Sequence, residues 1–152
     1  LNSSSHCSVS KVDADFLYVG GGADNEIADN TIGRLHLEAT WKNSIINNSI
    51  TGLLLVENSS DNLFVKNNIY DIFFRDNNNG NAFYANNFWR CKGNPGALHF
   101  FEFVGTNFWN NGSIGNYWFD YDGKDLNFDG IGIRLISLKP KLAMNLRIKL
   151  WK

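Results

Sequence analysis

Asparagine recurs at a fixed interval along the first half of this chain, and this repeat restricts the possible folds more than any other feature. One series is Asn25, Asn43, Asn62 and Asn81, and a second lies five residues later at Asn30, Asn48, Asn67 and Asn86. The successive intervals are 18, 19 and 19 residues in both series. A repeat of about 20 residues without a helical pattern is typical of stacked coils. Because amide side chains can bond to one another in ladders, the repeat predicts amide ladders along such a stack.

Apolar residues keep the same register and predict the filling of the coils. The four expected rows are Ile27, Ile45, Phe64 and Phe83; Ile32, Ile50, Ile69 and Phe88; Leu35, Leu53 and Ile72; and Leu37, Leu55 and Phe74. Shifted back by 18 residues, the rows also take in Val9, Ala14, Leu17 and Val19, with Cys7 and Val12 at the asparagine positions. Since alternate residues of a strand share one face, residues 8–90 are predicted to form about four and a half coils of short strands. Helix is rejected here because Asn, Gly, Ser and β-branched residues dominate.

Composition narrows the class of protein. The 152 residues suit one domain, and 23 of them are asparagine, a residue that favours turns. The net charge of −1 gives no reason to expect a nucleic-acid partner. No apolar run reaches the roughly 18 residues of a transmembrane helix. The chain begins at Leu1 without a methionine, which suggests a processed or truncated form.

The repeat is interrupted over residues 91–106 and resumes at Asn107 as a last coil. After Asp129 the chain contains six bases and no acid. Period-two alternation predicts strands on either side of a connection at Lys139-Pro140-Lys141. We therefore expect residues 1–132 to form the coils and residues 133–152 to form a β-hairpin cap or edge strand of the same domain. An apolar edge can instead pair with another chain, and its residues would be Leu142, Met144, Leu146, Ile148 and Leu150.

The closing segment of the coils carries a family resemblance. It runs from Gly115-Asn116-Tyr117-Trp118 to Asp129-Gly130-Ile131-Gly132, and it resembles the Gly-Asn-Tyr-Trp-Ser-Asp-Tyr…Asp-Gly-Ile-Gly-Asp ending of archaeal and bacterial surface β-helix repeat proteins. These are the NosD-like, carbohydrate-binding and sugar-hydrolase-like repeat proteins. The resemblance implies an all-β, right-handed parallel β-helix in an extracellular setting, where coil length alone also allows a left-handed one. It implies no activity, since a fold does not determine a function. Phe119, Phe128 and Ile133 depart from the family pattern.

A cation site is suggested within this closing segment. Oxygen-bearing side chains stand at Asp125, Asn127 and Asp129, and Gly130 follows them. This spacing can wrap calcium, with the carbonyl of Ile131 and the nearby Asp120 and Asp122 as further ligands. The bidentate Glu of a complete EF-hand loop is missing. We expect a structural calcium ion, with an Asx-turn bearing exposed acids as the alternative.

Two acids could form a catalytic pair. Glu57 and Asp76 lie 19 residues apart, so stacked coils would place them side by side. Two carboxylates about 5 Å apart can act as acid and nucleophile in a glycosidase. The alternative is a solvated pair at two polar turns. Copper ligation is not expected, because the histidines, cysteines and methionine have no spacing that would bring them together.

Other residue types suggest binding or modification. Tyr70, Tyr84 and Trp89 could form an outward platform for sugars or part of a subunit interface. Asn-X-Ser sequons at Asn2, Asn47, Asn58 and Asn111 permit glycosylation. Cys7 and Cys91 could form a disulfide in an oxidising compartment, or remain free thiols.

Three functions remain open. The first is a non-catalytic structural protein of the cell surface, a filament or adhesion subunit that associates with itself or with other surface proteins. The second is a carbohydrate-binding module that uses the outward aromatic residues. The third is a polysaccharide lyase or hydrolase that uses Glu57 and Asp76.

Overall fold

The computed structural model describes residues 1–89, 106–119, 131–132 and 148–149 of the chain. This part is built from strands and turns without helix, so it contains no helical segment that could cross a membrane. The short strands are β1 (Ser8–Ser10), β3 (Glu26–Ala28), β5 (Ser44–Ile46), β7 (Leu63–Val65) and β9 (Ala82–Tyr84). The strands that alternate with them are β2 (Asp13–Gly20), β4 (Thr31–Glu38), β6 (Ser49–Glu57), β8 (Asn68–Arg75) and β10 (Asn87–Phe88), followed by β11 (Tyr117–Trp118), β12 (Ile131–Gly132) and β13 (Ile148–Lys149).

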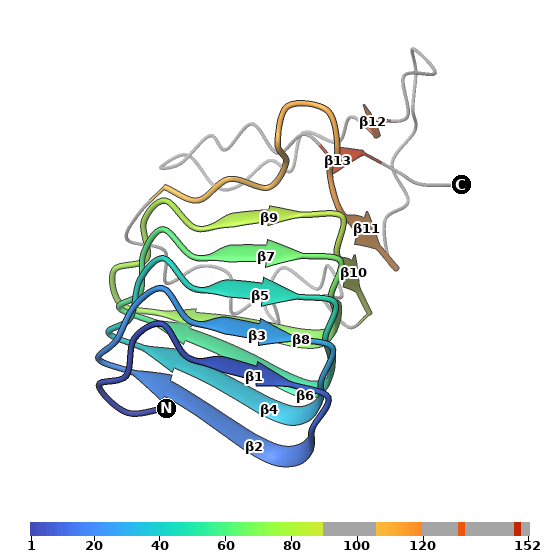
Figure 1. Cartoon of the computed structure of the whole chain (residues 1–152). Coiled ribbons are helices and arrows are strands. Elements are labelled where there is room, and N and C mark those ends of the chain that lie inside the picture. Colours follow the sequence, from blue (N-terminus) through green and yellow to red (C-terminus); the bar gives the residue numbers. More distant parts are fainter. Residues whose placement is uncertain (90–105, 120–130, 133–147, 150–152) are drawn as a thin grey trace.

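Strands β1 to β11 stack into two parallel sheets, one on each side of a coil. The short strands form a five-stranded sheet in the order β1-β3-β5-β7-β9, and a six-stranded sheet has the order β11-β10-β8-β6-β4-β2. In Figure 1 the chain runs to the right along the nearer sheet, returns to the left along the farther one, and rises from the N-terminus, which is a right-handed winding. The predicted right-handed parallel β-helix is therefore confirmed.

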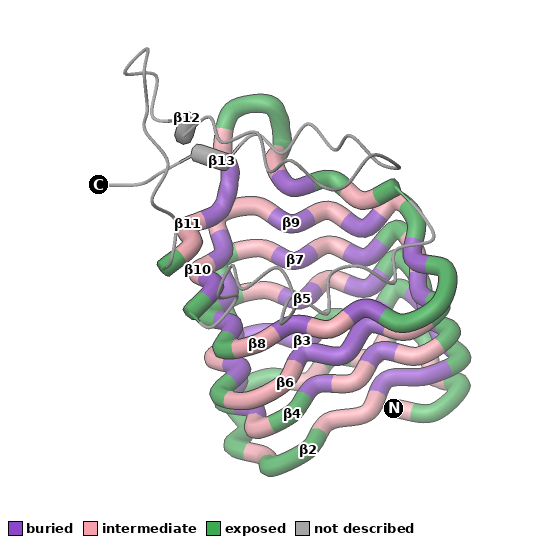
Figure 2. Tube along the Cα trace, turned by 180° about the vertical axis from the view of Figure 1, so that it is seen from behind, coloured by how far each residue is buried: buried purple, intermediate pink, exposed green. Residues whose placement is uncertain are grey.

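The asparagine repeat forms two continuous ladders inside the coil. Asn48 Nδ2 donates to Asn67 Oδ1 over 3.0 Å, and Asn67 Nδ2 donates to Asn86 Oδ1 over 3.0 Å. Each amide oxygen also accepts the backbone N–H of the asparagine in the coil before it. These amides are buried. Figure 2 shows that buried positions recur from coil to coil. A buried polar group is tolerated only when it is hydrogen-bonded, and the ladder supplies those bonds.

The first two predicted apolar rows are confirmed, and the third and fourth rows are wrong at one residue each. Ile27, Ile45, Phe64 and Phe83 lie in register, and Val9 lies below Ile27. In the six-stranded sheet, however, Leu35 pairs with Leu54 and Leu37 pairs with Val56. Leu54 and Val56 therefore point into the core in place of Leu53 and Leu55, and both are fully buried.

A β-bulge causes this correction. The register shifts between Ile50 and Leu53, so β6 contains one residue more than the simple count allows. The chain approaches its neighbour closely here: a Cβ on Gly52 would lie 2.4 Å from the carbonyl oxygen of Gly33. Glycine fits at such a bulge because it has no side chain to clash.

Aromatic rings fill the C-terminal end of the core. Phe83 stacks on Phe64 with ring centroids 4.3 Å apart, and Trp109 stacks on the other side at 4.8 Å. Trp109 belongs to the predicted last coil, which is confirmed because Asn107 and Asn116 extend the two ladders from Asn81 and Asn86.

A small antiparallel sheet lies beyond the coils. β12 pairs with β13 through Ile131–Lys149 and Gly132–Ile148, a register whose midpoint is Pro140. This pairing agrees with the predicted hairpin. Most of the proposed assembly edge, at Leu142, Met144, Leu146 and Leu150, lies outside the described residues.

Candidate functional site on the outer face of the six-stranded sheet

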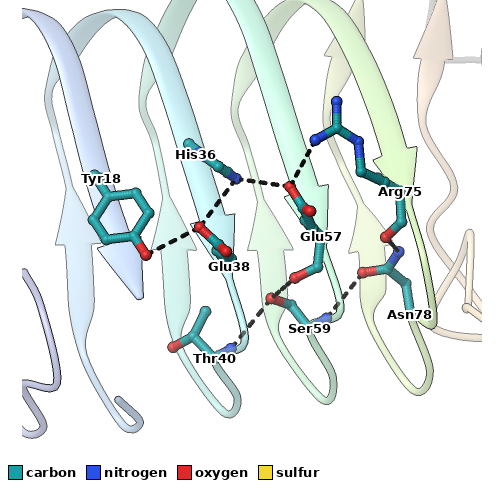
Figure 3. Close-up of polar contacts among 8 residues, drawn as sticks. All are labelled: Tyr18, His36, Glu38, Thr40, Glu57, Ser59, Arg75 and Asn78. Atoms are coloured by element: carbon teal, nitrogen blue, oxygen red, sulfur yellow. Dashed lines mark hydrogen bonds and ion pairs between the residues drawn. The ribbon is translucent and has the colours of Figure 1, made fainter. Parts of the chain in front are cut away.

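Charged and polar side chains gather on the outside of the six-stranded sheet, near the ends of β2, β4, β6 and β8. Parallel pairing places Glu38 beside Glu57, and Glu57 beside Arg75. On β4, His36 lies two residues before Glu38, and it pairs with Tyr18 of β2. All five side chains point outward because inward positions alternate with outward ones along a strand. We refer to these five residues as the outer polar cluster (Figure 3).

The cluster is a connected network across four coils. The Tyr18 hydroxyl donates to Glu38 Oε2 over 3.0 Å, and His36 Nε2 lies 3.9 Å from the same oxygen. His36 Nε2 is 3.3 Å from Glu57 Oε2, which also accepts from Arg75 Nη1 over 3.3 Å. The side chains of His36 and Glu57 are 14% and 16% exposed, against 44% for Glu38 and 51% for Arg75. The most buried carboxylate is thus the one with two basic partners.

Each carboxylate of the outer polar cluster has protein partners on a neighbouring coil. Glu57 is held between His36 and Arg75, and Glu38 already accepts a hydrogen bond from Tyr18. In each carboxylate it is Oε2 that makes these contacts, and the contacts link neighbouring coils. Partly exposed ion pairs contribute only about 0–1 kcal/mol each, so the cluster ties neighbouring coils together modestly.

The expected side-by-side pairing of Glu57 and Asp76 is wrong. Glu57 pairs with Arg75 instead, while Asp76 is exposed in the following turn with φ of 57°. The reason is the bulge in β6, whose extra residue lies before Glu57. The residue that pairs with Glu57 in the next coil is therefore 18 positions later and not 19. The two acids therefore do not occupy equivalent positions in their coils.

Beneath the cluster, a third polar ladder runs through the buried turns. Ser59 N–H donates to Asn78 Oδ1 over 3.0 Å, and Thr40 N–H donates to Ser59 Oγ over 3.3 Å. The Ser59 hydroxyl donates to the Glu57 carbonyl over 2.7 Å. Sequence reasoning missed this ladder because its rungs differ in residue type. The only available signal was their spacing of 19 residues.

The Tyr18 phenol gives the cluster a testable pH dependence. Its pKa is raised above the ordinary 10.0, first by the hydrogen bond to Glu38 and then by burial and the charges of Glu38 and Glu57. The unfolded chain therefore loses this proton at lower pH than the folded protein, so stability present below pH 10 declines as pH rises through the raised pKa.

We expect Tyr18→Phe to make the alkaline loss of stability shallower than in the parent protein. The measurement is the free energy of unfolding by urea at a series of pH values from about 8 to 11, a range that brackets the ordinary tyrosine pKa. Tyr84→Phe, which removes a phenol at the end of β9 in the other sheet, serves as the matched control. Identical slopes for Tyr18→Phe and the parent would contradict the assignment.

A second feature of the same outer face is a column of exposed aromatic rings. Tyr70, Trp89 and Phe119 occupy equivalent outward positions on three successive coils, and we name them the aromatic strip. Trp89 N–H donates to the Ile69 carbonyl and Phe119 N–H to the Phe88 carbonyl, which fixes this alignment. The three residues are 43%, 45% and 56% exposed. The rings of Trp89 and Phe119 have centroids 5.7 Å apart.

Amide groups lie next to the aromatic strip. Asn87 Nδ2 donates to Asn68 Oδ1 over 2.7 Å on the exposed surface, two residues before Trp89 and Tyr70 respectively. The structure thus brings together two of the three predicted sugar-binding residues, Tyr70 and Trp89. The third, Tyr84, ends β9 in the five-stranded sheet and is not part of the strip.

The predicted calcium ligands cannot be placed. The described part of the chain does not include the side-chain ligands Asp120, Asp122, Asp125, Asn127 and Asp129. It includes Ile131 only as part of the backbone of β12. Within the described ranges, no group of three His, Cys, Asp or Glu side chains could hold a metal ion. Calcium binding stays a prediction.

Cys7 is half-buried and has no disulfide partner among the described residues, and its Sγ donates to the Ser5 carbonyl over 3.6 Å. Its expected disulfide partner, Cys91, lies outside the part of the chain that the structure describes. The four sequon asparagines, Asn2, Asn47, Asn58 and Asn111, are all exposed.

Comparison with known proteins adds no assignment. No protein-family model, curated protein or solved structure matches this chain. Its function therefore has to be inferred from its own geometry.

Proposed function

We propose that this chain is a non-catalytic, extracellular β-helix that binds polysaccharide along the aromatic strip. The observation that carries the proposal is the exposure of Tyr70, Trp89 and Phe119 in one column of the outer face. Large exposed aromatic groups are costly to leave in water and mark interaction sites. Their flat apolar faces suit the C–H faces of sugar rings, and neighbouring polar groups can bond to the hydroxyls.

The polar groups around the strip support a carbohydrate partner. The exposed amides of Asn68 and Asn87 flank the rings and offer both donors and acceptors. Sugar-binding surfaces need this combination, because stacking supplies affinity and hydrogen bonds supply orientation. A polymer lying along the helix axis could contact one ring in each successive coil.

The scaffold itself supports a structural and non-catalytic role. Its buried amides are bonded from coil to coil, and the charged groups of the outer polar cluster are paired with one another. Only 19% of its residues are charged, which is low for a cytosolic domain. Association with itself or with other surface proteins through the C-terminal edge is a separate expectation, which depends on residues outside the described ranges.

The proposal is tested by a Trp89→Ala variant in sedimentation assays with insoluble polysaccharides. We expect binding to weaken about tenfold, which corresponds to a loss of about 1.4 kcal/mol. Trp41→Ala is the matched control, because Trp41 is 46% exposed at a turn away from the strip. Equal losses in the two variants, or no binding by the parent protein to any neutral or acidic polysaccharide, would overturn the proposal.

A further inference from the structure

Strand geometry separates the asparagines of this chain into two groups. A ladder asparagine points inward, and the residue two positions later points inward as well. That later residue is apolar, as with Ile27 after Asn25, or Ile50 after Asn48. A ladder asparagine therefore lacks the hydroxyl residue that a sequon requires. Sequons are confined by this geometry to asparagines outside the ladders.

Two sequon asparagines occupy exposed corners in the body of the helix. Asn47 lies in the turn between β5 and β6 with φ of 55°, and Asn58 directly follows β6 with φ of 44°. Their hydroxyl residues are Ser49 and Ser60. Both asparagine side chains project from corners of the coil, where a bulky attachment would displace no core residue.

We infer that Asn47 and Asn58 are N-glycosylated in the mature protein, an inference that rests on the extracellular setting of the proposed function. The donor class is a lipid-phosphate-linked oligosaccharide. The Nδ2 atom of asparagine attacks the anomeric carbon, a C–N bond forms, and the bond from that carbon to the phosphate oxygen breaks. The lipid phosphate leaves, and the transferase base takes the amide proton.

Neither modification conflicts with the folded structure. Asn47 Nδ2 donates to Asp29 Oδ1 over 2.6 Å, and this bond needs one of its two hydrogens. Glycosylation replaces one hydrogen and leaves the other. Asn58 lies at the end of β6, whereas the aromatic strip lies near the start of its own strands, so a glycan there leaves the strip accessible.

The test is mass spectrometry of the full protein purified from its natural source. We expect peptides containing Asn47 and Asn58 to carry glycans, which an amidase releases in heavy-oxygen water to leave labelled aspartate at both positions. Peptides containing the ladder residues Asn62 and Asn67 should remain unmodified.

Matched variants made in the same source separate sequon recognition from other modification. Ser60→Ala should remove the glycan from Asn58 although the acceptor is unchanged, and Ser60→Thr should keep it. Unmodified peptides at both sites, or a modification of Asn58 that persists in Ser60→Ala, would overturn the inference. A protein that is glycosylated but binds no polysaccharide would refute the binding proposal alone. A protein that binds polysaccharide but carries no glycan would refute this inference alone.

Discussion

Replacing Asn67 with alanine should lower the free energy of unfolding by about 3–5 kcal/mol, since each buried group left without a partner costs about 1–3 kcal/mol. The Asn67 amide donates to the Ile45 carbonyl and to Asn86, and it accepts from the backbone and side-chain N–H groups of Asn48. Alanine leaves the Ile45 carbonyl and the Asn48 backbone N–H without these bonds. Urea unfolding followed by circular dichroism measures the change.

The neighbouring residue provides the control for the ladder. Asn68 is exposed, and its side chain accepts one surface hydrogen bond from Asn87. Asn68→Ala should change stability by no more than about 0.5 kcal/mol, as is usual for surface sites. If Asn67→Ala were as mild as Asn68→Ala, the ladder would not be a source of stability.

Replacing Phe83 with alanine should be similarly destabilising, by about 3–5 kcal/mol. The Phe83 ring is fully buried between Phe64 and Trp109 and meets the edge of Phe74 at a centroid distance of 5.7 Å. Its removal would leave a cavity between stacked coils, and each coil of such a protein depends on its immediate neighbours. We expect a lower urea midpoint, with thermal unfolding as the second measurement.

Phe108→Ala is the control for this cavity. Phe108 is 55% exposed and lies in the coil that stacks on Phe83. The same chemical change at this surface position should cost far less. Equal destabilisation by the two variants would contradict the packing order of the C-terminal coils.

The regular part of the fold could be predicted because like residues stack on like. A column of Asn43, Asn62 and Asn81 satisfies its own hydrogen bonds, and a column of Ile45, Phe64 and Phe83 buries its own surface. Both relations follow from spacing alone. The last coil could be recognised for the same reason, since Asn107 continues a column across the interruption.

The outer face could not be predicted in this way. Outward residues need no match with the next coil, so Tyr18, His36, Glu57 and Arg75 show no repeat of residue type. Their meeting depends on parallel pairing combined with a bulge that shifts the register of one strand. The spacing that predicted a Glu57–Asp76 pair was counted without that bulge, and for this reason it placed the wrong residue beside Glu57.

The sequence by itself determined the coil length, the all-β class and the positions of the two amide ladders, because burial demands the same polar solution in every coil. Only the tertiary structure decided which leucines of β6 enter the core and which side chains meet on the outside. One additional residue at a bulge moves all later residues to the opposite face of a strand. At this bulge the backbones of Gly33 and Gly52 come so close that a side chain on Gly52 would meet the Gly33 carbonyl oxygen.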